Sequence, residues 1–330
     1  MKKLTFALFT ILASLLIISC GKAKVDENGC YYDIDDAVAV ANKKNQDIML
    51  IISVDGDDAD STDFMDKVVR DPGFKNEIAV NYAVVNMDFS QTAFEATAAA
   101  EDADAKTKKA ADAKAEIMKK HTRLVTLLEV AETPVVYILS KEKYFINGLF
   151  YDDTNRTLEG FKEALAAKSA LIDEMHKMIY QTKIGTAEEK VKSIDALYEA
   201  TNPTYRIFLY DLVDSVKKLD PSNSSGLVGK YIYEAAAIKS DLAFIDGDVR
   251  TAVQAYIDVA DEALIPAETR QIGMYTAAYM ASKRELDPIP VVIGYLEKAI
   301  QIAPESSQVP AINRVIAALQ AQAEAEAKAE

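Results

Sequence analysis

Asp47 to Val54 is the stretch that most limits what this chain can fold into. It is a continuous aliphatic and β-branched run, DIMLIISV, which is the pattern of a strand buried on both faces. An acidic turn follows, then a short helix with Phe64 and Val69 on its apolar side, and then a second apolar run from Ala79 to Phe89. A strand, a helix and a second strand joined by a crossover of this length favour parallel pairing. The stretch therefore predicts the centre of an α/β sheet.

Further elements of the same unit lie on either side of this centre. Apolar residues at helical spacing from Ile34 to Ala41 predict a helix before the first strand. Two β-rich runs, Pro134 to Ser140 and Tyr144 to Phe150, are separated by three charged residues and predict a hairpin. A helix with an apolar face between Leu158 and Leu165 closes the unit, which we expect to span residues 31 to 168.

This order of elements resembles the thioredoxin fold, with Thr133-Pro134-Val135 entering the hairpin. That family has a cis-proline at this point beside its active-site turn, so the resemblance implies that place for Pro134. The family carries Trp-Cys-x-x-Cys where the central strand ends and the helix begins, and this chain has Asp57-Asp58-Ala59-Asp60-Ser61 there. With the turn aligned in this way, Asp58 and Ser61 occupy the two cysteine positions.

The departure from that motif removes the chemistry of the family. Disulfide exchange needs a thiolate that attacks a sulfur atom and a second thiol that resolves the mixed disulfide. Neither Asp58 nor Ser61 can do this, so we expect a redox-inactive domain without a cofactor. Cys30 lies beside two tyrosines and away from any predicted helix start, which indicates a packed or idle thiol. The alternative is a thiol–disulfide oxidoreductase that uses Cys30 with a thiol of a partner.

The turn itself is crowded with carboxylates, namely Asp55, Asp57, Asp58, Asp60 and Asp63. Helix capping is one interpretation, because carboxylates near a helix start accept hydrogen bonds from free N–H groups and meet the positive end of the helix dipole. A calcium loop is a sharper one, with Asp55, Asp57, Asp58 and Asp60 as weak candidate ligands. Counting from Asp55, however, places Asp60 where such a loop needs glycine, so no metal site is predicted. An acidic recognition patch is the third interpretation.

Residues 91 to 123 form an insertion rich in Ala, Lys, Asp and Glu, without glycine or proline. This composition favours a helix, but large apolar residues are few, so we expect a polar helical arm. His121 lies near its end and His176 on a later helix. Neither has a second His, Cys or paired carboxylate at ligand spacing, so we expect structural or surface imidazoles.

From residue 169 to residue 330 the apolar periods are all helical. Thr186 to Glu189 has the pattern of a capping box at a helix start. Short turns separate the helices, which we expect to form antiparallel hairpins. The breaks fall at Asn202-Pro203, Asp220-Pro221, Asp246-Gly247, Ile265-Pro266, Asp287-Pro288 and Pro304.

The ends of two of these helices, before Pro221 and Pro304, are alike. The spacing of Leu296, Ala299 and Pro304 resembles that of the second helix of a tetratricopeptide repeat. The spacing of the prolines is irregular compared with the usual repeat of about 34 residues. We therefore expect a divergent tetratricopeptide-like helical repeat domain, with an unrelated helical bundle as the alternative. For Tyr275 and Tyr279 we prefer core packing to a place on a concave face.

Length, charge and cysteine content narrow the classes of function. A chain of 330 residues is long enough for two units with separate cores. The formal net charge of -15 speaks against a nucleic-acid partner, because binding to phosphates requires positive charge. With Cys20 and Cys30 as the two cysteines, no internal disulfide framework is expected.

Residues 1 to 19 have the pattern of a bacterial signal peptide, with two lysines before an apolar run from Leu4 to Ile18. Ser19-Cys20-Gly21 follows and resembles the bacterial lipoprotein box. The resemblance implies that Cys20 becomes the first residue of the mature chain and carries acyl chains such as palmitate. Such an anchor would hold the protein on the periplasmic or surface side of an envelope membrane. Residues 20 to 30 then form a short tether.

These features together predict a lipid-anchored cell-envelope protein with a redox-inactive thioredoxin-like domain and a helical solenoid. We expect it to act as a protein-interaction or scaffold module for an envelope protein partner that the sequence does not identify. The oxidoreductase that uses Cys30 is one alternative. A calcium-binding or small-ligand-binding lipoprotein, with the acidic turn as its site, is the other.

Overall fold

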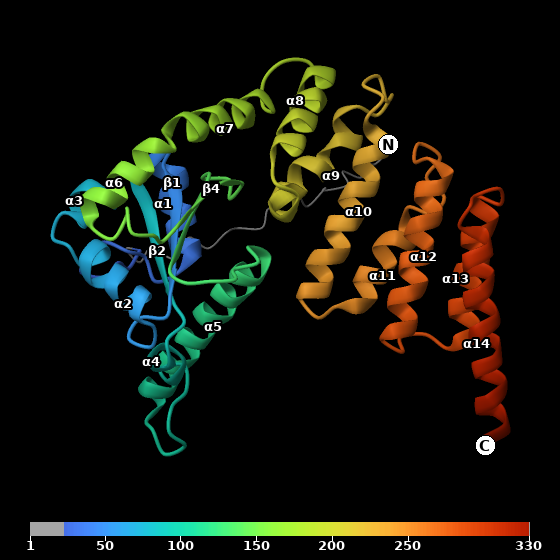
Figure 1. The fold of residues 1–330 in the computed structure, drawn as a ribbon, viewed down its shortest axis with the longest axis horizontal. Coiled ribbons are helices and arrows are strands. Elements are labelled where there is room, and N and C mark those ends of the chain that lie inside the picture. Colours follow the sequence, from blue (N-terminus) through green and yellow to red (C-terminus); the bar gives the residue numbers. More distant parts are fainter. Residues whose placement is uncertain (1–22, 330) are drawn as a thin grey trace, which may run out of the picture.

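The computed structural model describes residues 23–329 and consists of a sheet-containing part followed by a row of helices (Figure 1). The predicted signal peptide, residues 1 to 19, and the predicted lipidation site at Cys20 lie outside the described residues. Among residues 23–329, no helix has both the length and the apolar character needed to cross a membrane. The lipid anchor therefore stays a prediction.

A four-stranded mixed sheet forms the centre of the first part. Its strands are β1 (Asp47–Ser53), β2 (Tyr82–Asp88), β3 (Val135–Leu139) and β4 (Phe145–Phe150), in the order β2-β1-β3-β4. β1 pairs parallel with β2, and β3 pairs antiparallel with both β1 and β4. The predicted parallel pairing and the predicted hairpin are confirmed. An isolated parallel bridge between Tyr31 and Val85 extends the sheet beyond β2.

Both faces of the sheet are covered, which explains the continuous apolar sequence of β1. Met49 and Ile51 point into one cluster of buried side chains. Ile48, Leu50 and Ile52 alternate with them and point into a second cluster on the opposite face. The period of two along a strand thus divides one apolar run between two cores.

Helices cover each face of the sheet. The face of Met49 is covered by α2 (Ala59–Phe64), the π-helix η1 (Met65–Val69), α3 (Phe74–Glu77) and α6 (Leu158–Ala167). The face of Leu50 is covered by α1 (Ile34–Lys44) and the end of α5 (Ala105–Leu127). The predicted helices that begin and close this unit are confirmed.

The insertion at residues 91 to 123 is helical in two pieces. α4 (Gln91–Glu95) is short, residues 96–104 are irregular, and α5 continues beyond the expected end. Figure 1 shows the start of α5 projecting from the body, as expected for a polar arm. Its last turn, by contrast, packs Leu124 and the following Leu128 against the sheet. The arm is therefore anchored in the core at one end.

The second part, residues 169–329, contains helices and no strand. Its elements are α7 (Ser169–Gln181), α8 (Ala187–Ala200), the 3-10 helix η2 (Pro203–Leu209), α9 (Tyr210–Leu219), α10 (Val228–Ile245), α11 (Val249–Asp258), α12 (Ala267–Lys283), α13 (Ile289–Ile302) and α14 (Val309–Ala329). The helix breaks lie at the predicted positions, and Thr186 and Glu189 form the predicted capping box. The helical character is confirmed, and the type of repeat stays a prediction.

Apolar packing continues from the sheet into these helices. One cluster of buried residues includes Cys30 and Met49, passes through Ile172 on α7, and reaches Ile238 on α10. A separate cluster connects α11, α12, α13 and α14. The first of these clusters crosses residue 168, the predicted boundary between the two units, because α7 follows α6 directly and lies against β4.

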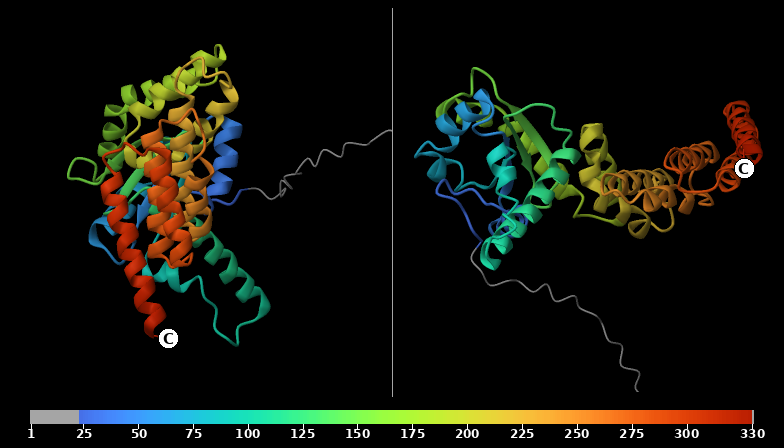
Figure 2. Two further views of the ribbon diagram at one scale, coloured as in Figure 1. Left: turned by 90° about the vertical axis from the view of Figure 1, so that its right-hand side faces the viewer. Right: turned by 90° about the horizontal axis from the view of Figure 1, so that it is seen from below.

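Polar and aromatic contacts add to this packing along the seam between the sheet and helices α7 to α10. The Tyr205 ring stacks on Phe145 with 3.7 Å between the ring centroids. The Tyr144 hydroxyl donates to Asp211 at 2.8 Å. From the seam, the row of helices runs away from the sheet towards the C-terminus (Figure 2).

Candidate functional site

The acidic turn lies between β1 and α2, where the thioredoxin resemblance places an active site. Asp58 is the N-cap of α2, and its side chain accepts a hydrogen bond from the Ser61 backbone N–H at 2.7 Å. Ser61 is fully buried, and its hydroxyl oxygen accepts a hydrogen bond from the Val54 N–H at 3.2 Å. The two positions aligned with the family's cysteines therefore hold the strand and the helix together, as capping predicts.

The other carboxylates of the turn also have partners within the chain. Asp55 pairs with the guanidinium of Arg70. Asp57 Oδ2 accepts from the Gln91 N–H at 2.5 Å, and Asp60 lies 3.7 Å from Arg156. Hydrogen bonds from Lys67 and Tyr151 to Asp63 lower the pKa of that carboxyl.

These carboxylates point to different partners and do not converge on one position. In the part of the chain that the structure describes, no group of three or more His, Cys, Asp or Glu side chains could hold a metal ion. This arrangement gives no support to Asp55, Asp57, Asp58 and Asp60 as calcium ligands. It is the arrangement expected of a turn whose charges stabilise local structure.

Pro134 lies beside this turn, and the Thr133–Pro134 peptide bond is cis. A cavity of about 10 Å³ lies next to it, and its lining includes the aromatic side chains of Phe64, Tyr151 and Phe161. Phe64 meets Tyr151 and Phe161 edge to face at 5.6 Å. This cavity has room for one water molecule at most and cannot hold a larger ligand.

Cys30, the residue of the oxidoreductase alternative, is buried with 1% of its surface exposed. Burial raises the pKa of its thiol, and the nearby Asp26 carboxylate raises it further. The reactive form in disulfide exchange is the thiolate, which this environment disfavours. Cys30 is a packed thiol in the core of the sheet, as predicted.

The two histidines have different environments, and neither is placed to bind a metal with other ligands. His176 on α7 lies 2.8 Å from Asp47 at the start of β1, and that hydrogen bond raises the pKa of the imidazole. His121 on α5 is buried, and its Nε2 atom has no hydrogen-bond partner among the described residues. Burial lowers the pKa of His121 to about 4. Both imidazoles have structural roles. The pKa shifts favour the protonated form of His176 and the neutral form of His121.

A different surface appears on α12. Ile272, Tyr275 and Tyr279 are 50, 36 and 56% exposed, so the prediction of core packing for the two tyrosines is wrong. The helix packs through its opposite face, where Gly273 and Ala277 are buried. A Cβ atom on Gly273 would lie 3.3 Å from the rings of Tyr233 and Tyr256, so small residues allow these neighbours to approach closely. The sequence pattern is apolar on both faces and could not show which one is buried.

A hollow that we call the junction hollow lies between the end of α5, η2 and α10 and has a volume of about 480 Å³. Its lining includes Tyr198, Arg206, Glu234 and Phe244. These residues come from distant parts of the sequence, so no local motif marks the site and sequence analysis missed it.

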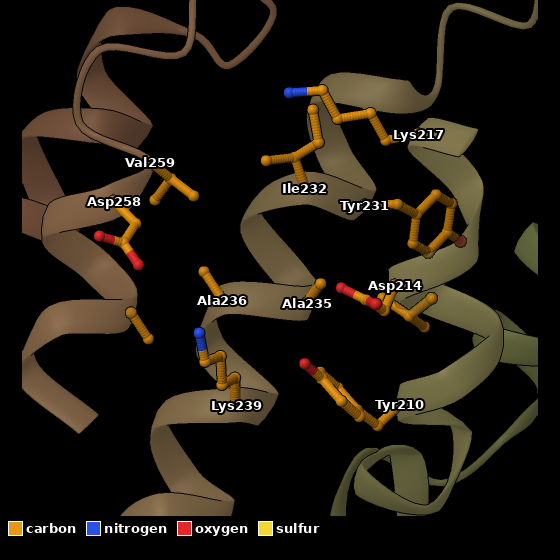
Figure 3. A pocket seen from close by; sticks show the side chains of 12 residues that line it. Tyr210, Asp214, Lys217, Tyr231, Ile232, Ala235, Ala236, Lys239, Asp258 and Val259 are labelled. Atoms are coloured by element: carbon orange, nitrogen blue, oxygen red, sulfur yellow. The ribbon is translucent and has the colours of Figure 1, made fainter. Parts of the chain in front are cut away.

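A smaller hollow, of about 190 Å³, lies between α9, α10 and α11 (Figure 3). Ala235 and Ala236 of α10 line the middle of it, and side chains of α9 and α11 face it from either side (Figure 3). Lys217, at the rim, is paired with Glu262 at 2.6 Å. Small side chains in the middle and opposite charges at the rim make this a shallow groove between packed helices.

Two comparisons with known proteins gave a match. Residues 227–325 match a family described as "Uncharacterised protein C-terminal domain", and the match begins directly before α10 and ends within α14. A solved structure named "DsbH Oxidoreductase" is 14% identical, with a TM-score of 0.30, and the match covers 45% of this chain and 90% of that chain. The comparison with curated proteins gave no match.

The architecture is a small mixed sheet of four strands with many helices, which partially matches a thioredoxin-like fold, followed by a helical C-terminal part. The partial match to a thioredoxin-like fold rests on the order of the four strands and on their parallel and antiparallel pairing.

Proposed function

We propose that this protein is a lipid-anchored envelope protein whose thioredoxin-like domain is redox-inactive and whose helical part binds another envelope protein. The exposed apolar face of α12 carries this proposal. Ile272, Tyr275 and Tyr279 follow each other at helical spacing, and each is exposed over at least about a third of its surface. Exposed tyrosines that are grouped in this way are typical of protein interfaces, where aromatic residues are enriched.

The composition of α12 supports a role outside folding for these side chains. Its buried face consists mainly of small residues, with Gly273, Ala277, Ala278 and Ala281 beside Met274. Three large apolar side chains, Ile272, Tyr275 and Tyr279, lie on the face that the fold leaves open. In a helix that serves only the stability of a monomer, large apolar side chains are expected on the buried face, because burying them contributes more to stability than exposing them.

The chemistry of the sheet supports the non-catalytic part of the proposal. Asp58 and Ser61 are used for capping and for the strand connection, and Cys30 is buried. No observation favours the oxidoreductase or the calcium-binding alternative.

Site-specific photo-crosslinking in cells tests the interaction. A crosslinking amino acid placed at Tyr279 should capture one defined envelope protein, and the same amino acid at Glu297, an exposed position on α13, should not. Replacing Ile272 and Tyr275 with serine should abolish the captured band, because the apolar face is then lost. Equal capture at both positions, or capture that survives the serine substitutions, would contradict the proposal.

Labelling with palmitate tests the anchor separately. The unmodified chain should incorporate label and sediment with membranes. Cys20→Ser should lose the label and leave the membrane fraction, because the predicted acyl chains supply most of the membrane affinity. A labelled Cys20→Ser protein would rule out this lipidation site.

A further inference from the structure

The lining of the junction hollow combines apolar side chains with carboxylates. Its apolar lining includes Leu127 from the end of α5, Ile207 from η2, and Ile245 from α10. At about 480 Å³ it can receive a whole side chain together with part of its backbone. The hollow is thus a groove with both apolar and polar lining, formed where the sheet part meets the helices.

Arg206 is the one basic residue in the lining of the hollow, and its guanidinium already has partners within the chain. The Arg206 guanidinium lies 4.4 Å from the centroid of the Tyr198 ring and bonds to Glu199 at 3.0 Å. Its Nε donates to the Thr201 carbonyl oxygen at 3.2 Å. Arg206 is therefore held by three partners and leaves the carboxylates of the lining without a counter-charge.

Three carboxylates of the lining have no ion-pair partner within residues 23–329. Glu234 accepts a hydrogen bond from the neutral Tyr198 hydroxyl at 2.6 Å. Glu129 lies 3.5 Å from the Thr204 hydroxyl. Among the described residues, no side chain donates a hydrogen bond to Asp241, and desolvation raises its pKa. The uncompensated charge of the hollow is negative, so its occupant should be positive.

Phe244 lies between the hollow and the residue that follows the end of α12. Phe244 lines the hollow and is 40% exposed. The Arg284 guanidinium, which follows the end of α12, lies 4.9 Å from the centroid of the Phe244 ring. An apolar segment bound at the C-terminal end of α12 would therefore lie next to Phe244 and the hollow that it lines.

We propose that the junction hollow receives a lysine or arginine side chain of a partner protein, presented by an apolar segment that also contacts α12. This inference rests on the proposed function. The stem of such a side chain would lie on Leu127, Ile207 and Ile245, and its charged end would meet Glu129, Glu234 and Asp241. Charge also argues against a second copy of this chain as the occupant, because the protein carries a formal net charge of -15 and two copies repel each other.

Selection from a library of random short peptides, displayed on phage and applied to the full-length protein, tests the inference without assuming a partner. We expect the selected peptides to share one Lys or Arg next to apolar residues. The best peptide is then compared with the same peptide carrying citrulline, which keeps the shape of arginine without its charge. The arginine peptide should bind about tenfold more tightly or better, as measured by fluorescence anisotropy.

Matched variants locate the site of binding. Asp241→Asn should weaken the arginine peptide several-fold and leave the citrulline peptide unchanged. Asp258→Asn, which removes an exposed carboxylate from the smaller hollow, is the control and should change neither. Thermal unfolding of each variant shows that the fold is intact.

The outcomes separate this inference from the proposed function. Selected peptides without a shared basic residue, equal binding of the arginine and citrulline peptides, or equal losses in Asp241→Asn and Asp258→Asn would each overturn the inference. The proposed function would survive these results if crosslinking at Tyr279 still captures a partner, and it would fall independently if that crosslink is unspecific.

Discussion

The acidic turn and the exposed face of α12 reverse the roles that their sequences suggest. The turn has five aspartates at the position where the resembling family performs its chemistry, yet their charges have partners within the chain. The face of α12 has no charged motif, yet Tyr275 and Tyr279 remain uncovered. The difference shows that a binding site is identified by the groups a fold leaves unpartnered, and not by the density of polar residues.

The largest expected change in stability concerns the packed aromatic side chains beside Pro134. Phe161→Ala removes a ring that is 1% exposed and packs against Phe64 beside Pro134. We expect a loss of about 3–5 kcal/mol in the free energy of unfolding, measured with urea. Phe150→Ala, at an exposed position of the same cavity lining, is the control and should cost far less. Equal losses would show that these side chains are not tightly packed and would weaken the comparison.

Acid should loosen α5, which forms one wall of the junction hollow. His121 is buried and neutral, and its pKa is lowered from 6.5 to about 4. Because the unfolded chain takes up the proton first, stability should fall by on the order of 3 kcal/mol as the pH drops from 6.5 to about 4. His121→Leu should remove this part of the pH dependence in a series of denaturation curves.

His176 gives the opposite sign and does not interfere in that window. Its pKa is raised by the bond to Asp47. The stabilisation from this pair is complete below pH 6.5 and is lost as the pH rises through the raised pKa. Unchanged stability of the parent protein between pH 6.5 and 4 would contradict the assignment of His121.

A smaller effect distinguishes capping from ligand binding at the turn. Asp58→Ala removes the N-cap of α2 and should lower stability by about 1 kcal/mol, measured by urea denaturation. Asp60→Ala, which loses only a long contact to Arg156, should change stability by less than about 0.5 kcal/mol. Calcium should not shift the melting temperature of the parent protein, and a calcium-dependent shift that Asp58→Asn removes would reverse the comparison.

The smallest expected change in stability is on the face of α12. Tyr279→Ser should alter the free energy of unfolding by no more than about 0.5 kcal/mol while removing partner binding. Ala277→Leu on the buried face should instead cost about 1–3 kcal/mol, because the site is fully packed. A large loss from Tyr279→Ser in a urea titration would mean that this tyrosine serves the fold.

Local patterns in the sequence predicted much of the fold. The apolar run of β1, the hairpin around residues 141 to 143 and the capping box at Thr186 depend on neighbouring residues, and each forms as expected. The interruption of the insertion at residues 96–104 was not predicted, since its composition favours helix throughout.

Features that depend on tertiary packing were beyond the sequence. Tyr275 and Tyr279 lie on a helix with apolar residues all round, so only the position of neighbouring helices decides which face is buried. The lining of the junction hollow includes Glu129 together with Glu234 and Asp241 of α10, and Glu129 is far from these two along the chain. Such a site can be found in a sequence only when the folded arrangement is known.

The cluster of buried side chains that runs from Cys30 to Ile238 has a mechanical consequence. A pull exerted on α10 by a partner bound at the junction hollow, and resisted at the N-terminal bridge between Tyr31 and Val85, would pass through continuous side-chain packing. Separating α7 to α10 from the sheet would expose that whole cluster at once. The part of the molecule from the sheet to α10 should therefore resist force as one stiff unit and unfold in one cooperative step.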